Sequence, residues 1–278
     1  MSILPIDTGR YGTKEMLDIF KEQKKIDYQL DIEAAAALSQ SEIGLISTSI
    51  AKDIAKVSKS GKITAKRIKQ LESKSDHDTA ALVEALAEKC KKESRPWIHY
   101  GLTSNDLVDT SNSMQMRDAI KIIQPKVSKL SLLLSKNAVK YKNIPAVGRT
   151  HGQHASIISF GLKFANWAAE MSTHLERLEE IKKRVLICKT MGVVGTGSLM
   201  GKNAIRVQER VARKLGLYPA KVTTQIIPRE RYAEYIFQMA LLGATLEKIA
   251  VEIRNLQRTE IAEVSEPVSY THLRAHET

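Results

Sequence analysis

Apolar side chains recur at alternating intervals of three and four residues in three long segments of the chain. One set spans Phe160–Val185 and another spans Tyr235–Leu256. A third set runs from Ile120 to Leu134 and continues across Pro125. A repeat that averages 3.5 residues places each set on one stripe of an α-helix. The pattern therefore predicts three long helices that pack nearly parallel to one another in a bundle.

The N-terminal part of the chain carries shorter helical patterns. Between residues 13 and 100 we expect these helices to break at Gly44, at Ser60-Gly61 and at Asp76-His77. Glycine adopts the backbone conformations that end a helix, and Asp and His favour turns and helix caps over helix interiors. The N-terminal region is therefore expected to be a group of short helices.

The predicted fold class is all-α. We expect a small helical domain over residues 1–102, followed over 103–267 by the opening part of a long-helix bundle. Brief extended pieces are expected at Val185–Thr190 and Thr223–Ile227, and no βαβ alternation is visible. A helix of about thirty residues is a rod of about 45 Å, and its full apolar stripe requires neighbours. A bundle shared between several subunits would supply them.

The C-terminal residues depart from these patterns. Val268–Thr278 resemble the conceptual translation of a transposase adapter used in sequencing libraries. We treat this segment as foreign to the protein and exclude it from the fold prediction. His272 and His276, whose i, i+4 spacing would suggest a metal site on a helix, are excluded with it.

The composition excludes several classes of protein. The chain is 43% hydrophobic and 27% charged, which is typical of globular proteins and excludes a disordered or collagen-like chain. No segment approaches the roughly 18 apolar residues that cross a bilayer, and the N-terminus lacks the features of a secretion signal. Cys90 and Cys188 form no CxxC motif, which fits a reducing compartment. We expect a cytoplasmic protein without a membrane partner.

The net charge of +12 allows three interpretations: nucleic-acid binding, binding of an anionic metabolite, or solvated helix faces. The lysines between Lys52 and Lys69 are spread along helical patterns without interleaved aromatic residues. This arrangement favours solvated faces over nucleic-acid binding, because base stacking requires aromatic side chains near the basic groups. Binding of an anionic metabolite stays open.

Four histidines lie in polar segments with little periodicity. They are His77, His99, His151 and His154, each close to Thr, Ser, Asn, Asp or Arg. Imidazole titrates near neutral pH and is therefore suited to proton transfer. His151 and His154 could face one metal ion, but no third ligand follows at a suitable spacing, so we predict no metal. His174 occupies an apolar stripe and is expected to be packed.

Two glycine-containing segments could approach an anion. Gly192–Asn203 resembles a phosphate-binding P-loop but departs from it, because Thr196 takes a glycine position and Asn203 replaces the magnesium-binding Ser or Thr. A substrate-facing loop and a plain connector both remain possible for this segment. Arg10, between Gly9 and Gly12, could bind a phosphate or carboxylate with two hydrogen bonds.

Seven short motifs follow one another along the chain up to about residue 267. They are Gly-Arg-Tyr-Gly (9–12), Ser-Asp-His-Asp (75–78), His-Tyr-Gly-Leu-Thr-Ser-Asn-Asp (99–106), Gly-Arg-Thr-His-Gly-Gln-His (148–154), Gly-Val-Val-Gly-Thr (192–196), Thr-Thr-Gln (223–225) and Ile-Arg-Asn-Leu-Gln-Arg-Thr-Glu (253–260). Their order resembles the adenylosuccinate lyase family within the fumarase/aspartase superfamily. Related lyases share the Thr-Ser-Asn-Asp and Arg-Thr-His-Gly-Gln motifs, whereas the first three motifs favour this family.

The resemblance implies a cofactor-independent β-elimination in purine nucleotide synthesis. Fumarate would leave adenylosuccinate, giving AMP, and would leave the succinylated aminoimidazole carboxamide ribotide. His151 would be the general acid and His77 its partner. The substrate-binding residues implied by the resemblance are Arg10, Tyr11 and His99 for the phosphate, and Thr103, Ser104, Thr150 and Gln225 for the succinyl and base portions. Asp106 is included with them and would orient the Thr-Ser turn.

The chain departs from the family pattern at its C-terminal end. In the family, a loop reading Ser-Ser-x-Met-Pro-His-Lys-x-Asn-Pro follows the last motif and carries the serine base, whereas here Glu266-Pro267 lead into the adapter-like tail. Superfamily active sites combine segments from three subunits of a homotetramer, so this chain would supply two of them. We expect residues 1–278 alone to be inactive and prone to aggregation. The alternatives are another lyase of the superfamily and a basic helical module that binds nucleic acid.

Overall fold

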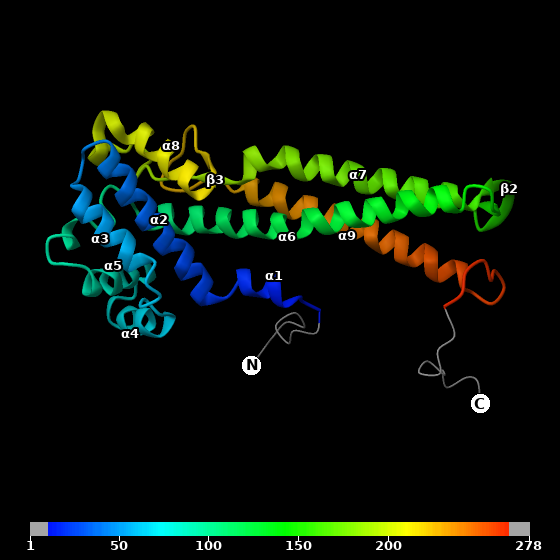
Figure 1. Ribbon diagram of the computed structural model, residues 1–278, viewed down its shortest axis with the longest axis horizontal. Coiled ribbons are helices and arrows are strands. Elements are labelled where there is room, and N and C mark those ends of the chain that lie inside the picture. Colours follow the sequence, from blue (N-terminus) through cyan, green and yellow to red (C-terminus); the bar gives the residue numbers. More distant parts are fainter. Residues whose placement is uncertain (1–10, 267–278) are drawn as a thin grey trace. The chain divides into compact units, whose positions relative to one another are not determined.

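The computed structural model describes residues 11–266 of the chain (Figure 1). Contacts divide these residues into two compact units, one of 11–124 with 179–235 and the other of 125–178 with 236–266. Arg10 lies outside the described residues, as does the adapter-like tail with His272 and His276.

The first unit begins with five helices. They are α1 (Lys14–Ile19), α2 (Glu22–Glu42), α3 (Thr48–Ser58), α4 (Ala65–Ser75) and α5 (Asp78–Lys89). The predicted breaks are confirmed, since Gly44, Gly61 and Asp76 all have positive φ between successive helices. The side chains of Ser47 and Thr64 then accept hydrogen bonds from the first turns of α3 and α4.

The remaining elements confirm the all-α class. They are η2 (Arg95–Trp97), α6 (Ser104–Lys140), β1 (Pro145–Thr150), β2 (Gln153–Ser159), α7 (Phe160–Val185), β3 (Ile187–Cys188), η3 (Ser198–Asn203), α8 (Ala204–Leu215), β4 (Tyr218–Pro219) and α9 (Glu230–Leu256). The helix α7 has the predicted bounds, α6 continues through Pro125, and α9 begins earlier than predicted, at Glu230. Within residues 11–266, no helix combines the length and the apolar character that a membrane span requires.

No strand was predicted from the sequence over residues 145–159, but β1 and β2 pair there as an antiparallel hairpin. His151 and Gly152 form its turn, and both have positive φ, 54° and 70°. Two left-handed residues are what a tight hairpin turn requires. The register shifts between Gly148 and Arg149, so the hairpin lacks a regular alternation of apolar and polar residues.

The expected extended piece at Thr223–Ile227 is also wrong. Ile187-Cys188 pairs instead with Tyr218-Pro219, in parallel, and α8 forms the crossover between the two strands. The backbone N–H of Ile227 donates to the carboxylate of Asp109 at 2.7 Å, so a side chain replaces a strand as its partner. A βαβ unit with two-residue strands is too short to show an alternating pattern in the sequence.

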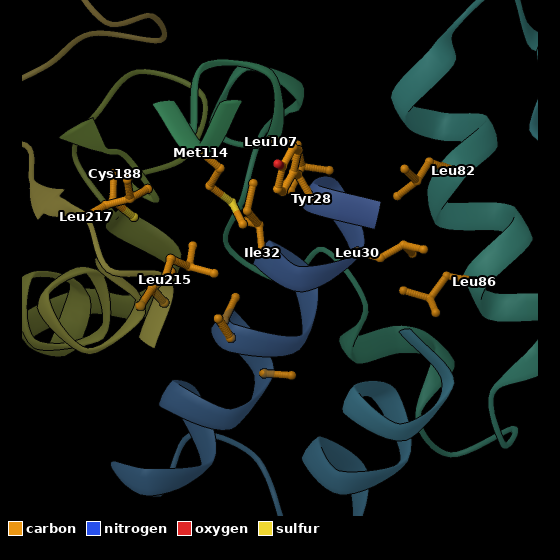
Figure 2. Close-up of a cluster of buried hydrophobic side chains, with 14 of the residues drawn as sticks. Tyr28, Leu30, Ile32, Leu82, Leu86, Leu107, Met114, Cys188, Leu215 and Leu217 are labelled. Carbon is orange, nitrogen blue, oxygen red and sulfur yellow. The ribbon is translucent and has the colours of Figure 1, made fainter. Parts of the chain in front are cut away.

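The core of the first unit gathers around α2 (Figure 2). Its labelled members are Tyr28, Leu30, Ile32, Leu82, Leu86, Leu107, Met114, Cys188, Leu215 and Leu217. The four alanines of Ala34–Ala37 are all buried, and small side chains allow α3 and α8 to approach α2 closely. Cys90 and Cys188 are buried free thiols, and burial raises the pKa of Cys90 to about 11. At neutral pH such thiols are protonated and unreactive.

An ionic contact at the edge of this core gives a prediction for stability. Asp118 accepts hydrogen bonds from Tyr28 at 2.8 Å and from Arg117 at 2.8 Å. Burial alone would raise the pKa of Asp118, but these donors outweigh it and lower the pKa to about 2. Because the folded-state pKa lies below the ordinary value of 3.8, the stabilisation is present above about pH 4 and is lost as the pH falls through 2.

We therefore expect Asp118→Asn to lower the free energy of unfolding at pH 7 by about 2 kcal/mol, since one pKa unit corresponds to about 1.4 kcal/mol. Urea unfolding at pH 7 and pH 3 would measure this, with Glu209→Gln, an exposed carboxylate of α8, as the control. The loss should be smaller at pH 3. Equal losses at the two pH values would contradict the assignment.

The second unit contains the hairpin, the second half of α6, and most of α7 and α9. His174 of α7 is 4% exposed and its Nε2 lies 2.9 Å from the hydroxyl of Thr245 on α9, which confirms the predicted packed histidine. Burial and the nearby Arg177 lower the pKa of His174. On α9, Leu242 is buried, whereas Leu246 and Ile253 are each about two-fifths exposed.

Candidate active site

His77 lies at the N-cap of α5. Its Nδ1 accepts a hydrogen bond from the backbone N–H of Ala80 at 3.2 Å. Because Nδ1 accepts, the neutral ring carries its hydrogen on Nε2. The ring is half exposed, with the carboxylate of Asp78 3.8 Å from Nδ1. The cap therefore fixes the ring and leaves Nε2 available as a donor.

His99 is held by a buried carboxylate of α2. Its Nδ1 lies 2.6 Å from Oε1 of Glu33, and its backbone N–H donates to Oε2 of the same residue at 2.9 Å. Burial of His99 opposes protonation, but the hydrogen bond to Glu33 and the negative charges of Glu33 and Asp106 outweigh it and raise the pKa of His99. The residue also has a left-handed backbone, with φ 61°.

The Thr-Ser turn at the start of α6 is anchored by Asp106. One oxygen of this carboxylate accepts from the backbone N–H groups of Thr103 at 3.0 Å and Gly192 at 2.9 Å. The other oxygen pairs with the ammonium group of Lys189, and both side chains are fully buried. Burial raises the pKa of Asp106 against the opposing charge of Lys189. Asp106 therefore holds the turn in place from within, while Thr103 and Ser104 are partly exposed.

The glycine-rich loop packs against two other motifs in the first unit. Gly195 has φ 78°, and a Cβ at this position would lie 2.2 Å from the carbonyl oxygen of Thr223. A Cβ at Gly192 would lie 3.2 Å from the carbonyl oxygen of Gly101. Only glycine at position 195 permits the backbone of this loop to lie so close to the carbonyl oxygen of Thr223. The structure thus brings together motifs 99–106, 192–196 and 223–225, and Gln225 is exposed beside them.

Within residues 11–266, the remaining predicted site residues lie on the hairpin and at the N-terminal end. Thr150 and His151 are exposed at the hairpin turn of the second unit. Arg149 forms an ion pair with Glu263 at 2.6 Å, which fastens the hairpin to the segment after α9. Tyr11 is 69% exposed at the start of the first unit, next to the undescribed Arg10. In the described part of the chain, no three His, Cys, Asp or Glu side chains are arranged to hold a metal ion.

Comparison with known proteins places this arrangement in a family. A protein-family model described as Lyase matches residues 9–272. The chain belongs to this lyase family. The adenylosuccinate lyase of Methanocaldococcus jannaschii is 44% identical over 266 residues, which cover 96% of this chain and 57% of that protein. The chain spans 57–59% of the length of the first curated relatives that it matches.

Solved structures of a lyase and of a cycloisomerase share the fold of this lyase chain. A fumarate lyase from a Mesorhizobium species matches with a TM-score of 0.85 and 30% identity, covering 92% of this chain and 61% of that one. A beta-carboxy-cis,cis-muconate cycloisomerase from Acinetobacter calcoaceticus matches with a TM-score of 0.86 and 27% identity, covering 95% of this chain and 62% of that one. The long-helix architecture is therefore common to enzymes with different names.

Four buried polar residues that hold the lyase motifs were missed in the sequence. Glu33 and Gln40 hold the 99–101 segment from α2, the latter through a 2.7 Å hydrogen bond to the carbonyl of Tyr100. Lys189 neutralises Asp106, and Asp109 accepts from Arg229 at 2.6 Å. A signal was available for Glu33 only, because a carboxylate beside the run Ala34–Ala37 is unusual on a buried helix face.

Proposed function

We propose that the full-length protein is an adenylosuccinate lyase, which cleaves a C–N bond and releases fumarate from adenylosuccinate and from succinylated aminoimidazole carboxamide ribotide. The observation that carries the proposal is the meeting of three motifs around Asp106, beside the N-terminus of α6 and beside His99, whose pKa is raised by Glu33. A helix N-terminus and an imidazolium both favour anions. The proposed substrates carry a phosphate and two carboxylates. The 44% identity to the Methanocaldococcus jannaschii enzyme of this name supports the same conclusion.

The reaction requires a base, an acid and hydrogen-bond donors that stabilise the negative charge of the intermediate. A base removes a proton from the carbon beside a carboxylate, an aci-carboxylate forms, and an acid protonates the departing nitrogen. We assign the acid to His151 and a supporting role to His77, whose Nε2 is left as a donor by the N-cap. The glycine-rich loop, Thr103 and Ser104 would supply preorganised donors to the developing dianion. The family resemblance implies a serine base from a further segment.

The proposal includes a homotetramer in the cytoplasm. The exposed side chains of Leu246 and Ile253 on α9 support association with further helices. The buried free thiols Cys90 and Cys188 suit a reducing compartment. We also propose the domain boundary near residue 102, because the long helix α6 begins at Ser104. In such an assembly, His77 and His151 would meet at a site built from several subunits.

The decisive experiment is a turnover assay on the chain extended to the full length of its relatives. Fumarate release from adenylosuccinate should be faster than from argininosuccinate or aspartate in the same assay. Absence of fumarate with adenylosuccinate, in a folded and assembled preparation, would refute the proposal. Purified 1–278 should give no turnover.

Another lyase of the superfamily is the second candidate. It is favoured by the solved structures that share the fold at 27–30% identity under other names. Adding beta-carboxy-cis,cis-muconate to the substrate panel distinguishes the candidates, since preferential turnover of that compound would replace the first assignment. Salt-dependent binding of DNA or RNA, unaffected by adenylosuccinate, would instead indicate the basic nucleic-acid-binding module.

A further inference from the structure

We infer that Glu33 is a positioning residue of the proposed site, which fixes the ring nitrogen that His99 presents and favours protonation of that ring, so that Nε2–H of His99 binds the phosphate of the substrate. The inference rests on the proposed function for the identity of the anion. The contact between Glu33 and His99 itself depends on no functional assignment. Both residues belong to the first unit.

Each carboxylate oxygen of Glu33 contacts a different group of His99. Oε2 accepts the backbone N–H of His99 at 2.9 Å, which fixes the main chain at this residue. Oε1 lies 2.6 Å from Nδ1, which fixes the plane of the ring. A carboxylate only accepts hydrogen bonds, so Nδ1 must carry a hydrogen and Nε2 is the nitrogen left for a ligand. Replacing either oxygen changes the way His99 is presented.

The surrounding charges favour the imidazolium form. Glu33 faces His99 from α2 and is 2% exposed, and Asp106 adds its charge from α6. The ammonium group of Lys189 is already paired with Asp106. A carboxylate as buried as Glu33 is costly unless it is paired with a cation, and His99 is its hydrogen-bonding partner. The pair is therefore most stable with His99 protonated.

The helix α2 holds the rest of the segment as well. Gln40, buried and two turns after Glu33, donates to the carbonyl of Tyr100 at 2.7 Å. Residues seven apart share one helix face, so a single rigid face fixes both His99 and Tyr100. The α6 N-terminus follows at Ser104 and would provide backbone donors to the same anion. Together these groups favour a phosphate, which accepts hydrogen bonds from several directions.

The test is a nuclear magnetic resonance titration of the 278-residue chain with ¹³C,¹⁵N-labelled histidine. The His99 signal is assigned by its loss in His99→Gln. In the wild type we expect the neutral ring to carry hydrogen on Nδ1, with a titration midpoint above the ordinary imidazole value of about 6.5. Glu33→Gln should lower the midpoint, because only the charge of Asp106 then opposes the effect of burial. Added inorganic phosphate should shift the His99 signal in the wild type and much less in Glu33→Gln.

Asp31→Asn is the matched control, since it removes one carboxylate from the same helix without contacting His99. Its His99 midpoint should equal that of the wild type. The inference is overturned if wild-type His99 carries hydrogen on Nε2 in its neutral form, a measurement that needs no variant. It is also overturned if Glu33→Gln leaves the midpoint in place or if phosphate leaves the wild-type signal unchanged. Failure of the full-length protein to release fumarate would refute the proposed function separately, because the pH titration reads only the contact between Glu33 and His99 and the phosphate addition reads only anion binding.

Discussion

Replacing His151 by glutamine in the full-length protein is expected to lower kcat for fumarate release by about 10²–10⁴-fold, the usual contribution of a general acid. Glutamine can donate a hydrogen bond but cannot transfer a proton to the departing nitrogen. The KM for adenylosuccinate should change little, because the imidazole acts on the transition state more than on bound substrate. Steady-state kinetics of fumarate formation would measure both constants.

His154→Gln is the matched control for this prediction. It removes an imidazole from β2 of the same hairpin, where residue 154 pairs with Arg149 away from the turn. This variant should retain kcat close to the wild-type value. If His151→Gln turns over as fast as the control, the acid assignment is wrong.

Replacing Lys189 by methionine is expected to lower the free energy of unfolding by about 3–5 kcal/mol, the usual cost of removing one partner from a buried ion pair. The change would leave the carboxylate of Asp106 fully buried without its cation. Asp106 would still accept from Thr103 and Gly192, but these neutral donors compensate a full charge poorly. Urea unfolding of the 278-residue chain would measure the loss, which should shrink at low pH as Asp106 takes up a proton.

Lys182→Met serves as the surface comparison. Lys182 pairs with Glu179, whose side chain is 63% exposed, and such pairs contribute about 0–1 kcal/mol. Combining Lys189→Met with Asp106→Asn should recover part of the loss, because the second change removes the uncompensated charge. A loss for Lys189→Met no larger than that for Lys182→Met would show that the buried pair does not stabilise the fold.

The helices were predictable because their pattern is local. The 3.5-residue repeat in 160–185 has the same bounds as α7, and the breaks at Gly44 and Asp76 follow from residues that readily adopt left-handed backbone. The hairpin was not predictable in this way. Its bulge at Gly148 disrupts the alternation of apolar and polar residues, and its strands are largely exposed.

The sequence predicted the site residues whose side chains can act on a ligand. It did not predict the residues that only hold those side chains in place. His77, His99 and His151 stand out because each lies in a polar motif and imidazole is suited to proton transfer. The run Ala34–Ala37 indicates that Glu33 is buried without indicating its partner, and Lys189 looks like an ordinary solvated charge in a basic sequence. Their partners lie 66 and 83 residues away, and only the folded chain brings them together.

His99 and His151 have a left-handed backbone, which lowers the stability of the fold, while their side chains serve the proposed reaction. Among residues 11–266, the non-glycine positions with positive φ are Asp76, His99, His151 and Ala262, so the first three lie in or beside the histidine motifs. Glycine would relax each of these turns by on the order of 1 kcal/mol. At positions 99 and 151 it would also remove the imidazole. Substitutions that are meant to raise the free energy of unfolding should therefore be made in the helices and not in these turns.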